Sequence, residues 1–221
     1  MQKSFFCTPY RIILSLAFLA NFTGLNAVNK KEDLDIPPTE DLMREHGVIH
    51  RIFLIYEEII KRIDKKDKIP LKELYKTANI IRSFIEEYHE KLEENYIFSL
   101  FEKNKKETEL VKTLKRQHIQ GKKITKQLLK IVAQKEPLNN QTKKQLQALM
   151  QEFITMYRPH AAWEDTVLFP QVRALITKKG FEDLGEIFED IETQLFGNKG
   201  FETIVKDVES IEKELGIYGL K

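Results

Sequence analysis

Apolar residues recur at steps of three and four over most of the chain beyond residue 38, the spacing that places them on one face of a helix. A charged break at residues 64–68 follows the first such segment, and a turn-forming stretch at residues 137–140 separates the third from the fourth. We therefore predict four long amphipathic helices. Their apolar stripes run through Leu42–Ile63, Leu74–Tyr96, Leu110–Val132 and Leu146–Trp163.

Individual residues predict where these helices begin and bend. Thr39 is expected to cap the first helix, with acidic residues 40–41 in its first turn at the positive end of the helix dipole. Pro70 can open the second helix, because the first helical position has no backbone hydrogen bond to lose. Pro159 and Pro170 are expected to bend the fourth helix, since each removes a backbone donor.

The chain shows no sustained strand alternation and no hairpin signal. Long amphipathic helices joined by short loops favour an all-α fold, an up-down-up-down four-helix bundle, over residues 39–177. Residues 28–38 are expected to be a linker before the bundle, and residues 178–221 a C-terminal helical extension. The two shorter helices expected in this extension are Phe181–Phe196 and Phe201–Leu215.

Residues 1–27 differ in character from the rest of the chain. Lys3 and Arg11 are their only charges, and Ile12–Phe22 is an uncharged, mostly apolar run of 11 residues. This is the pattern of a secretory signal peptide, so we expect an exported protein, periplasmic or secreted. The alternative is an uncleaved membrane anchor over residues 12–28, because that uncharged stretch of 17 residues is near the lower limit for a membrane span.

Composition narrows the classes of function once this leader is set aside. The chain has 36 Lys and Arg against 34 Asp and Glu, and the leader holds two of the basic residues, which leaves 34 of each sign. Such a balance lacks the basic excess of nucleic-acid-binding proteins, so no nucleic-acid partner is expected. The only cysteine, Cys7, lies in the leader. Any metal site in the remaining chain must therefore use imidazole and carboxylate groups.

Four of the five histidines follow a repeated pattern. Two His-x-x-x-Glu motifs stand at residues 89–93 and 160–164, and each aims an imidazole and a carboxylate from one face of a helix. His46 precedes the first motif by 43 residues, and His118 precedes the second by 42 residues. The chain thus consists of two similar units, each a helix with one histidine followed by a helix with His-x-x-x-Glu.

Stacking these two units in one bundle would bring four imidazoles and two carboxylates together among apolar residues. Burial of such groups without partners is costly, and two adjacent divalent cations would remove that cost. Imidazole suits iron, zinc or copper, and a carboxylate can bridge two metals. His50 lies four residues after His46 and could be a further ligand, an outer partner or a core residue. The predicted metal ligands are His46, His89, Glu93, His118, His160 and Glu164.

The motifs that carry these residues resemble the hemerythrin-like cation-binding (HHE) family, bacterial type. They are Asp-Leu-Met-Arg-Glu-His-Gly at residues 41–47, the first His-x-x-x-Glu motif, the lone His118, Pro-His-Ala-Ala-Trp-Glu at residues 159–164 and Leu-Phe-Pro at residues 168–170. The resemblance covers residues 39–177. It implies that the six predicted ligands hold a non-haem di-iron centre of two iron ions, with Glu93 and Glu164 as the bridging carboxylates.

The chain departs from two related kinds of di-iron protein. The oxygen-carrying hemerythrins of marine invertebrates have a His-x-x-x-His pair in the third helix, whereas Lys122 stands at the second position here. One coordination position is therefore expected to be open or filled by water, which counts against reversible oxygen transport. A ferritin-like bundle would need two Glu-x-x-His motifs, and only Glu86-x-x-His89 matches.

The expected function is a non-enzymatic di-iron protein that binds a small ligand such as dioxygen, nitric oxide or peroxide, for sensing, scavenging or storage. The alternatives are a di-iron enzyme that reduces peroxide or nitric oxide, iron handling or repair of damaged iron centres, and a structural bundle with a vestigial site. Tyr88 and Tyr157 lie near predicted ligands and could be redox or proton partners of such an enzyme, but they are expected to be core residues. A membrane partner is expected only with an uncleaved leader, and protein partners stay open.

Overall fold

The computed structural model describes residues 36–134 and 137–219, so the predicted leader at residues 1–27 lies outside the described residues. The described residues form four long helical rods and two further helices, and they contain no strand. The first rod is α1 (Pro38–Lys65) and the third is α5 (Thr108–Val132). The second rod joins α2 (Leu71–Ile80), η1 (Ile81–His89), α3 (Glu90–Leu92), η2 (Glu93–Ile97) and α4 (Phe98–Asn104). The fourth rod joins α6 (Asn140–Trp163), η3 (Glu164–Leu168) and α7 (Phe169–Leu175), and α8 (Lys178–Phe196) and α9 (Gly200–Leu215) follow it.

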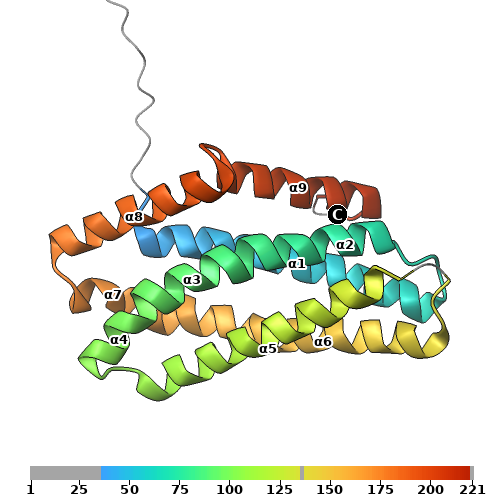
Figure 1. Cartoon of the computed structure of the whole chain (residues 1–221), viewed down its shortest axis with the longest axis horizontal. Coiled ribbons are helices and arrows are strands. Elements are labelled where there is room, and N and C mark those ends of the chain that lie inside the picture. The colour runs from blue at the N-terminus through green and yellow to red at the C-terminus, as the bar shows by residue number, and fades with distance from the viewer. Residues whose placement is uncertain (1–35, 135–136, 220–221) are drawn as a thin grey trace, which may run out of the picture. The chain divides into compact units, whose positions relative to one another are not determined.

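The four rods pack side by side as a closed bundle (Figure 1). α1 packs against α6, α6 against α5, and α5 against α2 and η1, while α1 also contacts α2 and η1. Short turns join successive rods, so neighbours in sequence run in opposite directions. The predicted all-α, up-down-up-down bundle is confirmed, and its core is continuous along the rods. α9 lies on α1 and α2, and α8 lies on α1 and α9.

Two details of the predicted helices are wrong. Thr39 does not cap α1, which begins at Pro38 with Pro37 before it and has no side-chain cap. A proline at the first helical position has its φ angle already set and no N–H to satisfy. The helix can therefore begin at Pro38, one residue before Thr39. Trp163 was expected on the inner stripe, but it is 54% exposed. Glu164, the next residue, points inward, and one residue turns an α-helix by about 100°.

Three segments of the rods are π-helical, and two of them begin at a predicted ligand. η2 starts at Glu93 and η3 starts at Glu164. The backbone N–H of Phe98 donates to the carbonyl of Glu93, and the N–H of Phe169 donates to the carbonyl of Glu164, each five residues back. Such π segments inside α-helices are frequent at functional sites, because they turn a side chain away from the regular helical direction.

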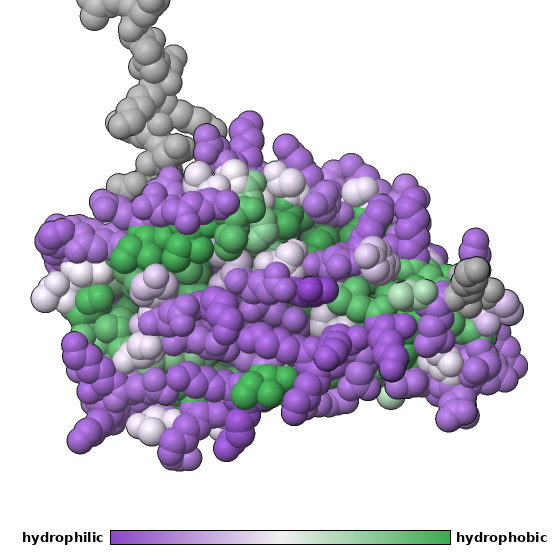
Figure 2. All heavy atoms as spheres, in the orientation of Figure 1, coloured by the Kyte–Doolittle hydropathy of each residue, from purple (hydrophilic) through white to green (hydrophobic). Residues whose placement is uncertain are grey.

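Polar contacts hold the C-terminal helix α9 on the bundle. The Arg51 guanidinium donates to both oxygens of the Glu212 carboxylate, at 2.9 and 2.6 Å, and Arg62 donates to the carbonyl of Leu215 at 2.7 Å. The face of the molecule in Figure 2 is largely hydrophilic, with separate apolar patches. Among the described helices, none combines the length and the apolar character that a transmembrane span requires.

Two glycines in the middle of helices have opposite surroundings. Gly47 in α1 is exposed, and a Cβ atom built there would meet nothing within 4 Å. Gly121 in α5 is buried, and a Cβ atom there would lie 2.0 Å from the hydroxyl oxygen of Tyr157 and 2.7 Å from two carbons of its ring. Gly121 therefore makes room for the Tyr157 side chain, whose hydroxyl donates to the buried Glu90 carboxylate at 2.5 Å.

Gly47→Ala and Gly121→Ala should change the free energy of unfolding in opposite directions. Gly47→Ala should stabilise the protein by about 0.5–1 kcal/mol, because alanine loses less backbone freedom in a helix. Gly121→Ala should destabilise it by about 1–3 kcal/mol, because the added methyl group overpacks the Tyr157 ring. Urea unfolding of both variants measures the difference, and equal stabilisation by the two substitutions would contradict the packing described here.

Glu86 is a buried acid in η1 that belongs to the bundle core. It is 6% exposed, and its burial raises the pKa from 4.5 to about 7. In the unfolded chain the carboxyl group ionises near its ordinary value, so between these two pH values the folded state binds more protons than the unfolded state. Ionisation of Glu86 therefore opposes folding as the pH rises from 4.5 to about 7, and the destabilisation is complete above that range.

Glu86→Gln should remove this destabilisation. We expect the variant to exceed the wild type by up to about 3 kcal/mol at pH 8 and to match it near pH 4. Glu87→Gln is the matched control, because Glu87 is exposed and pairs only with Arg82 among the described residues. Urea unfolding at several pH values tests the prediction, and a difference that stays constant with pH would refute the role of Glu86 ionisation.

Candidate metal centre

The structure brings all six predicted ligands to one place inside the bundle. All six side chains are buried, and every one of the four rods contributes. They are His46 in α1, His89 at the end of η1, Glu93 at the start of η2, His118 in α5, His160 in α6 and Glu164 at the start of η3. His50, which the sequence left open, is exposed and packs near Phe53 with ring centres 5.5 Å apart.

The Glu93 carboxylate lies between the histidines of the two sequence units. Its Oε1 atom is 3.4 Å from Nε2 of His89 and 3.8 Å from Nε2 of His46. Its Oε2 atom is 3.4 Å from Nε2 of His118. Oε1 thus faces His46 and His89 while Oε2 faces His118, which is the arrangement of a carboxylate able to bridge two cations.

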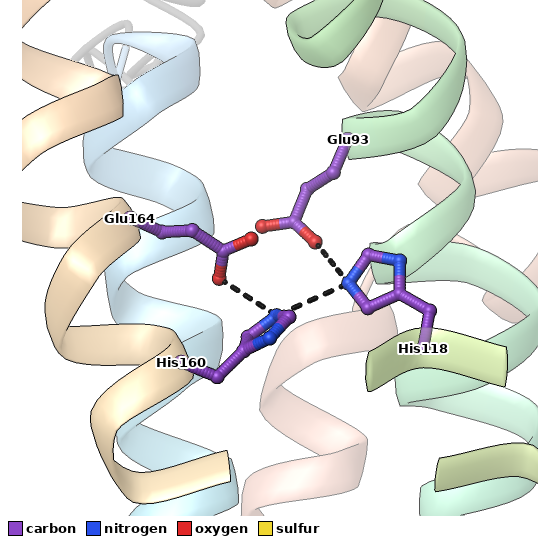
Figure 3. Close-up of side chains that lie close together, drawn as sticks. All are labelled: Glu93, His118, His160 and Glu164. Atoms are coloured by element: carbon purple, nitrogen blue, oxygen red, sulfur yellow. Dashed lines mark hydrogen bonds and ion pairs between the residues drawn. The ribbon is translucent and has the colours of Figure 1, made fainter. Parts of the chain in front are cut away.

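The Glu164 carboxylate enters from the opposite side of the same space (Figure 3). Its Oε2 atom is 3.1 Å from Nε2 of His160 and 3.5 Å from Nε2 of His46. The Nε2 atoms of His118 and His160 lie 3.1 Å apart. Two imidazole nitrogens that bind one metal at about 2.1 Å and at right angles would themselves be about 3 Å apart, so this spacing suits a shared cation.

Each of the four imidazoles is held from behind by an oxygen acceptor. In every case the acceptor contacts Nδ1, so an Nδ1–H can donate to it and Nε2 faces the centre. Bonds of this kind set the orientation and tautomer of histidines that bind metals. The pairs are His46 with Asp165 (2.7 Å), His89 with Glu45 (2.6 Å), His118 with Glu94 (3.1 Å) and His160 with Gln117 (2.9 Å).

These outer acceptors repeat the pattern of the ligands. Glu45 and Gln117 each precede a lone histidine by one residue, and Glu94 and Asp165 each follow a ligand glutamate by one residue. Each acceptor holds a histidine on a neighbouring rod. These four roles were not predicted from the sequence, although their fixed offsets from the ligands in both units could have indicated them.

Two phenylalanines cover imidazoles of the centre in the same repeated way. Phe98 stacks on His118 with ring centres 5.5 Å apart, and Phe169 stacks on His46 with ring centres 5.6 Å apart. Each phenylalanine is nine residues after the histidine of its own His-x-x-x-Glu motif. Both rings are buried, so they exclude water from the centre and fix the faces of the imidazoles that they contact.

The residues present fit a pair of cations. Nε2 of His46 and all four carboxylate oxygens of Glu93 and Glu164 are buried without a hydrogen-bond partner. Unpaired polar atoms at such depth are unfavourable unless a cation binds them. Among the described residues three sets of ligand atoms converge closely enough to hold an ion; one is Glu90, Glu94 and His118, and the other two share Glu93. The two sets that share it are His46, His89 and Glu93, and Glu93, His118, His160 and Glu164.

The charges of these groups change the proton affinities in the absence of metal. Burial and the charge of Glu164 raise the pKa of Glu93 to about 8. Burial lowers the pKa of His118, but neighbouring glutamates outweigh it and raise the pKa to about 10. Burial and the other three imidazoles hold the pKa of His89 well below its ordinary value. Metal binding at this place would therefore displace protons from Glu93 and His118.

Lys122 occupies the place at which the sequence analysis noted a missing histidine. Its Nζ atom lies 2.9 Å from Oε2 of Glu90 and 3.4 Å from Oε1 of Glu94. Tyr157, expected to be a core residue, is buried and donates to the same Glu90 carboxylate. Lys122, Glu90 and Tyr157 thus form a polar group behind His118, which the sequence did not predict.

Comparisons with known proteins agree with the site. The profile of the hemerythrin HHE cation-binding domain family matches residues 38–195, more than half of the chain. Uncharacterized proteins of Mycobacterium bovis and of two Mycobacterium tuberculosis strains are 41% identical to it over 190 residues, or 86% of this chain and 74% of each relative. No solved structure gives a significant match.

The family match and the buried His/Glu cluster indicate a metal-binding protein, and iron is the typical metal of hemerythrin-type domains. The chain therefore belongs to the hemerythrin HHE cation-binding domain family.

Proposed function

We propose that this protein holds a non-haem di-iron centre and binds a small ligand there, such as dioxygen, nitric oxide or peroxide. The role of that binding is sensing, scavenging or storage. The proposed iron ligands are the six converging residues, with Glu93 and Glu164 as bridges. One position for iron is then His46 and His89 with the bridges, and the other is His118 and His160 with the bridges.

The observation that carries this proposal is the way the Glu93 carboxylate divides its oxygens between the two imidazole pairs. Oε1 faces His46 and His89, and Oε2 faces His118, yet neither oxygen has a hydrogen-bond partner. A single cation beside one imidazole pair would leave the oxygen that faces the other pair buried and unpaired. Two cations satisfy both oxygens, together with the lone pairs of the four imidazoles.

The donor set also supports a site with room for an added ligand. Each iron would receive two imidazole nitrogens and shared carboxylate oxygens, which resembles the two-histidine, one-carboxylate sets that leave positions open on non-haem iron. When bound, the irons would supply those open positions and the redox chemistry. The chain orients the imidazoles through their Nδ1–H bonds and excludes water with Phe98 and Phe169.

A second candidate function is the reduction of peroxide or nitric oxide at the same centre, with an external electron donor. Tyr157 favours it, because its ring lies 5.2 Å from the ring of His160 and its hydroxyl is hydrogen-bonded to Glu90. This places a phenol beside one proposed ligand. Turnover of peroxide or nitric oxide with a supplied reductant would separate the enzyme from the binding protein.

Export is also a proposal, and it is based on the sequence of residues 1–27. The short charged start and the apolar run favour a cleaved signal peptide and a periplasmic or secreted location. Export would separate the centre from cytosolic iron–sulfur proteins, so it favours ligand binding over the repair of such centres. Mass spectrometry of the protein from its own cells would show whether the leader is removed.

The purified protein, loaded anaerobically with ferrous iron, should hold two irons per chain and change its optical spectrum on addition of dioxygen or nitric oxide. His118→Ala should lose at least one iron, because it removes a nitrogen donor from the centre. His50→Ala is the matched control and should keep both irons, because His50 is exposed and outside the converging sets. Metal analysis and optical titration measure these outcomes.

The possible failures of this experiment have different meanings. A wild-type protein that takes up no iron would contradict the di-iron centre. A protein that holds two irons but shows no spectral response to dioxygen, nitric oxide or peroxide would contradict the small-ligand function alone. Equal iron loss in His118→Ala and His50→Ala would contradict the assigned ligands.

A further inference from the structure

The two halves of the centre differ in one outer acceptor. We call the proposed iron position next to His46 and His89 the first position, and that next to His118 and His160 the second position. Glu45 accepts from Nδ1–H of His89 at 2.6 Å, whereas the equivalent residue in the other unit, Gln117, accepts from Nδ1–H of His160 at 2.9 Å. The outer acceptor of His89 at the first position is therefore a carboxyl group, whereas the outer acceptor of His160 at the second position is a neutral amide.

The halves differ again at the residue four positions after each lone histidine. In the second half this residue is Lys122, whose ammonium pairs with Glu90 and with Glu94, the outer acceptor of that half. In the first half the equivalent residue is His50, which is exposed. The equivalent outer acceptor, Asp165, has no Lys or Arg within ion-pair distance in the described part of the chain.

These differences leave the acids behind the two positions with unequal ion pairing. Behind the second position stand two carboxylates, Glu90 and Glu94, and two ammonium groups, because Lys91 also pairs with Glu94 at 2.6 Å. Behind the first position stand the carboxylates of Glu45 and Asp165, with no ammonium or guanidinium group paired to them among the described residues. The acids behind the first position therefore lack the ammonium partners that the acids behind the second position have.

Unequal surroundings affect how strongly each half binds a cation. A carboxylate that accepts from Nδ1–H makes the imidazole a better donor at Nε2 than an amide does, and it attracts the cation directly. Both effects act at the first position, whereas Gln117 and Lys122 weaken them at the second.

We infer that the two positions are unequal, and that ferrous iron fills the His46/His89 position before the His118/His160 position. The inference rests on the proposed di-iron centre and adds an order of loading and a distinction between the irons. The second iron is then the more weakly held one and the one that exchanges with added metal.

An anaerobic titration of the metal-free, full-length protein with ⁵⁷Fe²⁺ tests this inference. A competing chelator gives the dissociation constants, and Mössbauer spectra at one and two equivalents show how many iron environments are present. We expect two binding steps that differ by about tenfold or more, since outer partners change metal affinity by roughly 10–100-fold. At one equivalent a single quadrupole doublet should dominate, and a second one should appear at two equivalents.

Two isosteric substitutions identify which position fills first. Glu45→Gln should weaken the tighter step by about 10–100-fold and bring the two steps together. Gln117→Glu should strengthen the weaker step by about tenfold and leave the tighter one unchanged. Circular dichroism and thermal unfolding of the metal-free variants establish that each is folded, and Gln117→Glu keeps the test decisive if Glu45→Gln does not fold.

The outcomes of these experiments test the order of filling separately from the proposed di-iron centre. Two irons that bind in one step with equal affinity, or a Glu45→Gln variant weakened only in its weaker step, would overturn the order of filling and leave the di-iron centre intact. A wild-type protein without bound iron would overturn the centre itself. Two steps, each shifted by its own variant, would establish the inequality.

Discussion

Two carboxylates and four imidazoles converge in the interior of this bundle, and their need for positive charge governs how the surrounding structure is arranged. Both oxygens of Glu93 and of Glu164 are buried without a hydrogen-bond partner, and imidazole Nε2 atoms lie 3.4 Å from Glu93 and 3.1 Å from Glu164. Protons on the imidazoles satisfy such a group only in part, because imidazoles this close together oppose one another's protonation. Bound cations would satisfy it, and the outer acceptors, the stacked phenylalanines and the π-helical segments hold the donor groups in place.

The internal repeat explains how one chain builds such a site. Each unit supplies a lone histidine, a His-x-x-x-Glu motif, a π-helical segment that begins at the glutamate, and a phenylalanine nine residues after the motif histidine. The units then exchange support, since Glu94 and Phe98 of the first unit contact His118 of the second. Neither unit can complete its half of the centre alone. The repeat is broken chiefly at two places in the second unit. Gln117 stands where the first unit has Glu45, and Lys122 stands where it has His50. These differences can make two otherwise similar positions unequal.

The bundle and the six inner residues could be predicted because both depend on helical periodicity, which is local. A histidine and a glutamate four residues apart on an apolar stripe must point the same way, and only the bundle interior receives four such stripes. The exposure of His50 could not be predicted in this way, because a residue four positions from His46 lies at the edge of the same stripe. The outer acceptors, the pairing of Lys122 with Glu90, and the π-helical turns depend on contacts between rods. The periodicity of a single helix does not predict such contacts.

The central claim is that a pair of irons sits among these six side chains. Anomalous X-ray diffraction at the iron absorption edge, from crystals of the iron-loaded protein, tests it most directly. The account predicts two anomalous peaks inside the bundle, one beside His46 and His89 and one beside His118 and His160, with Glu93 between them. Peaks confined to acidic residues on the surface, or iron absent from the interior of crystals grown with iron in excess, would contradict it.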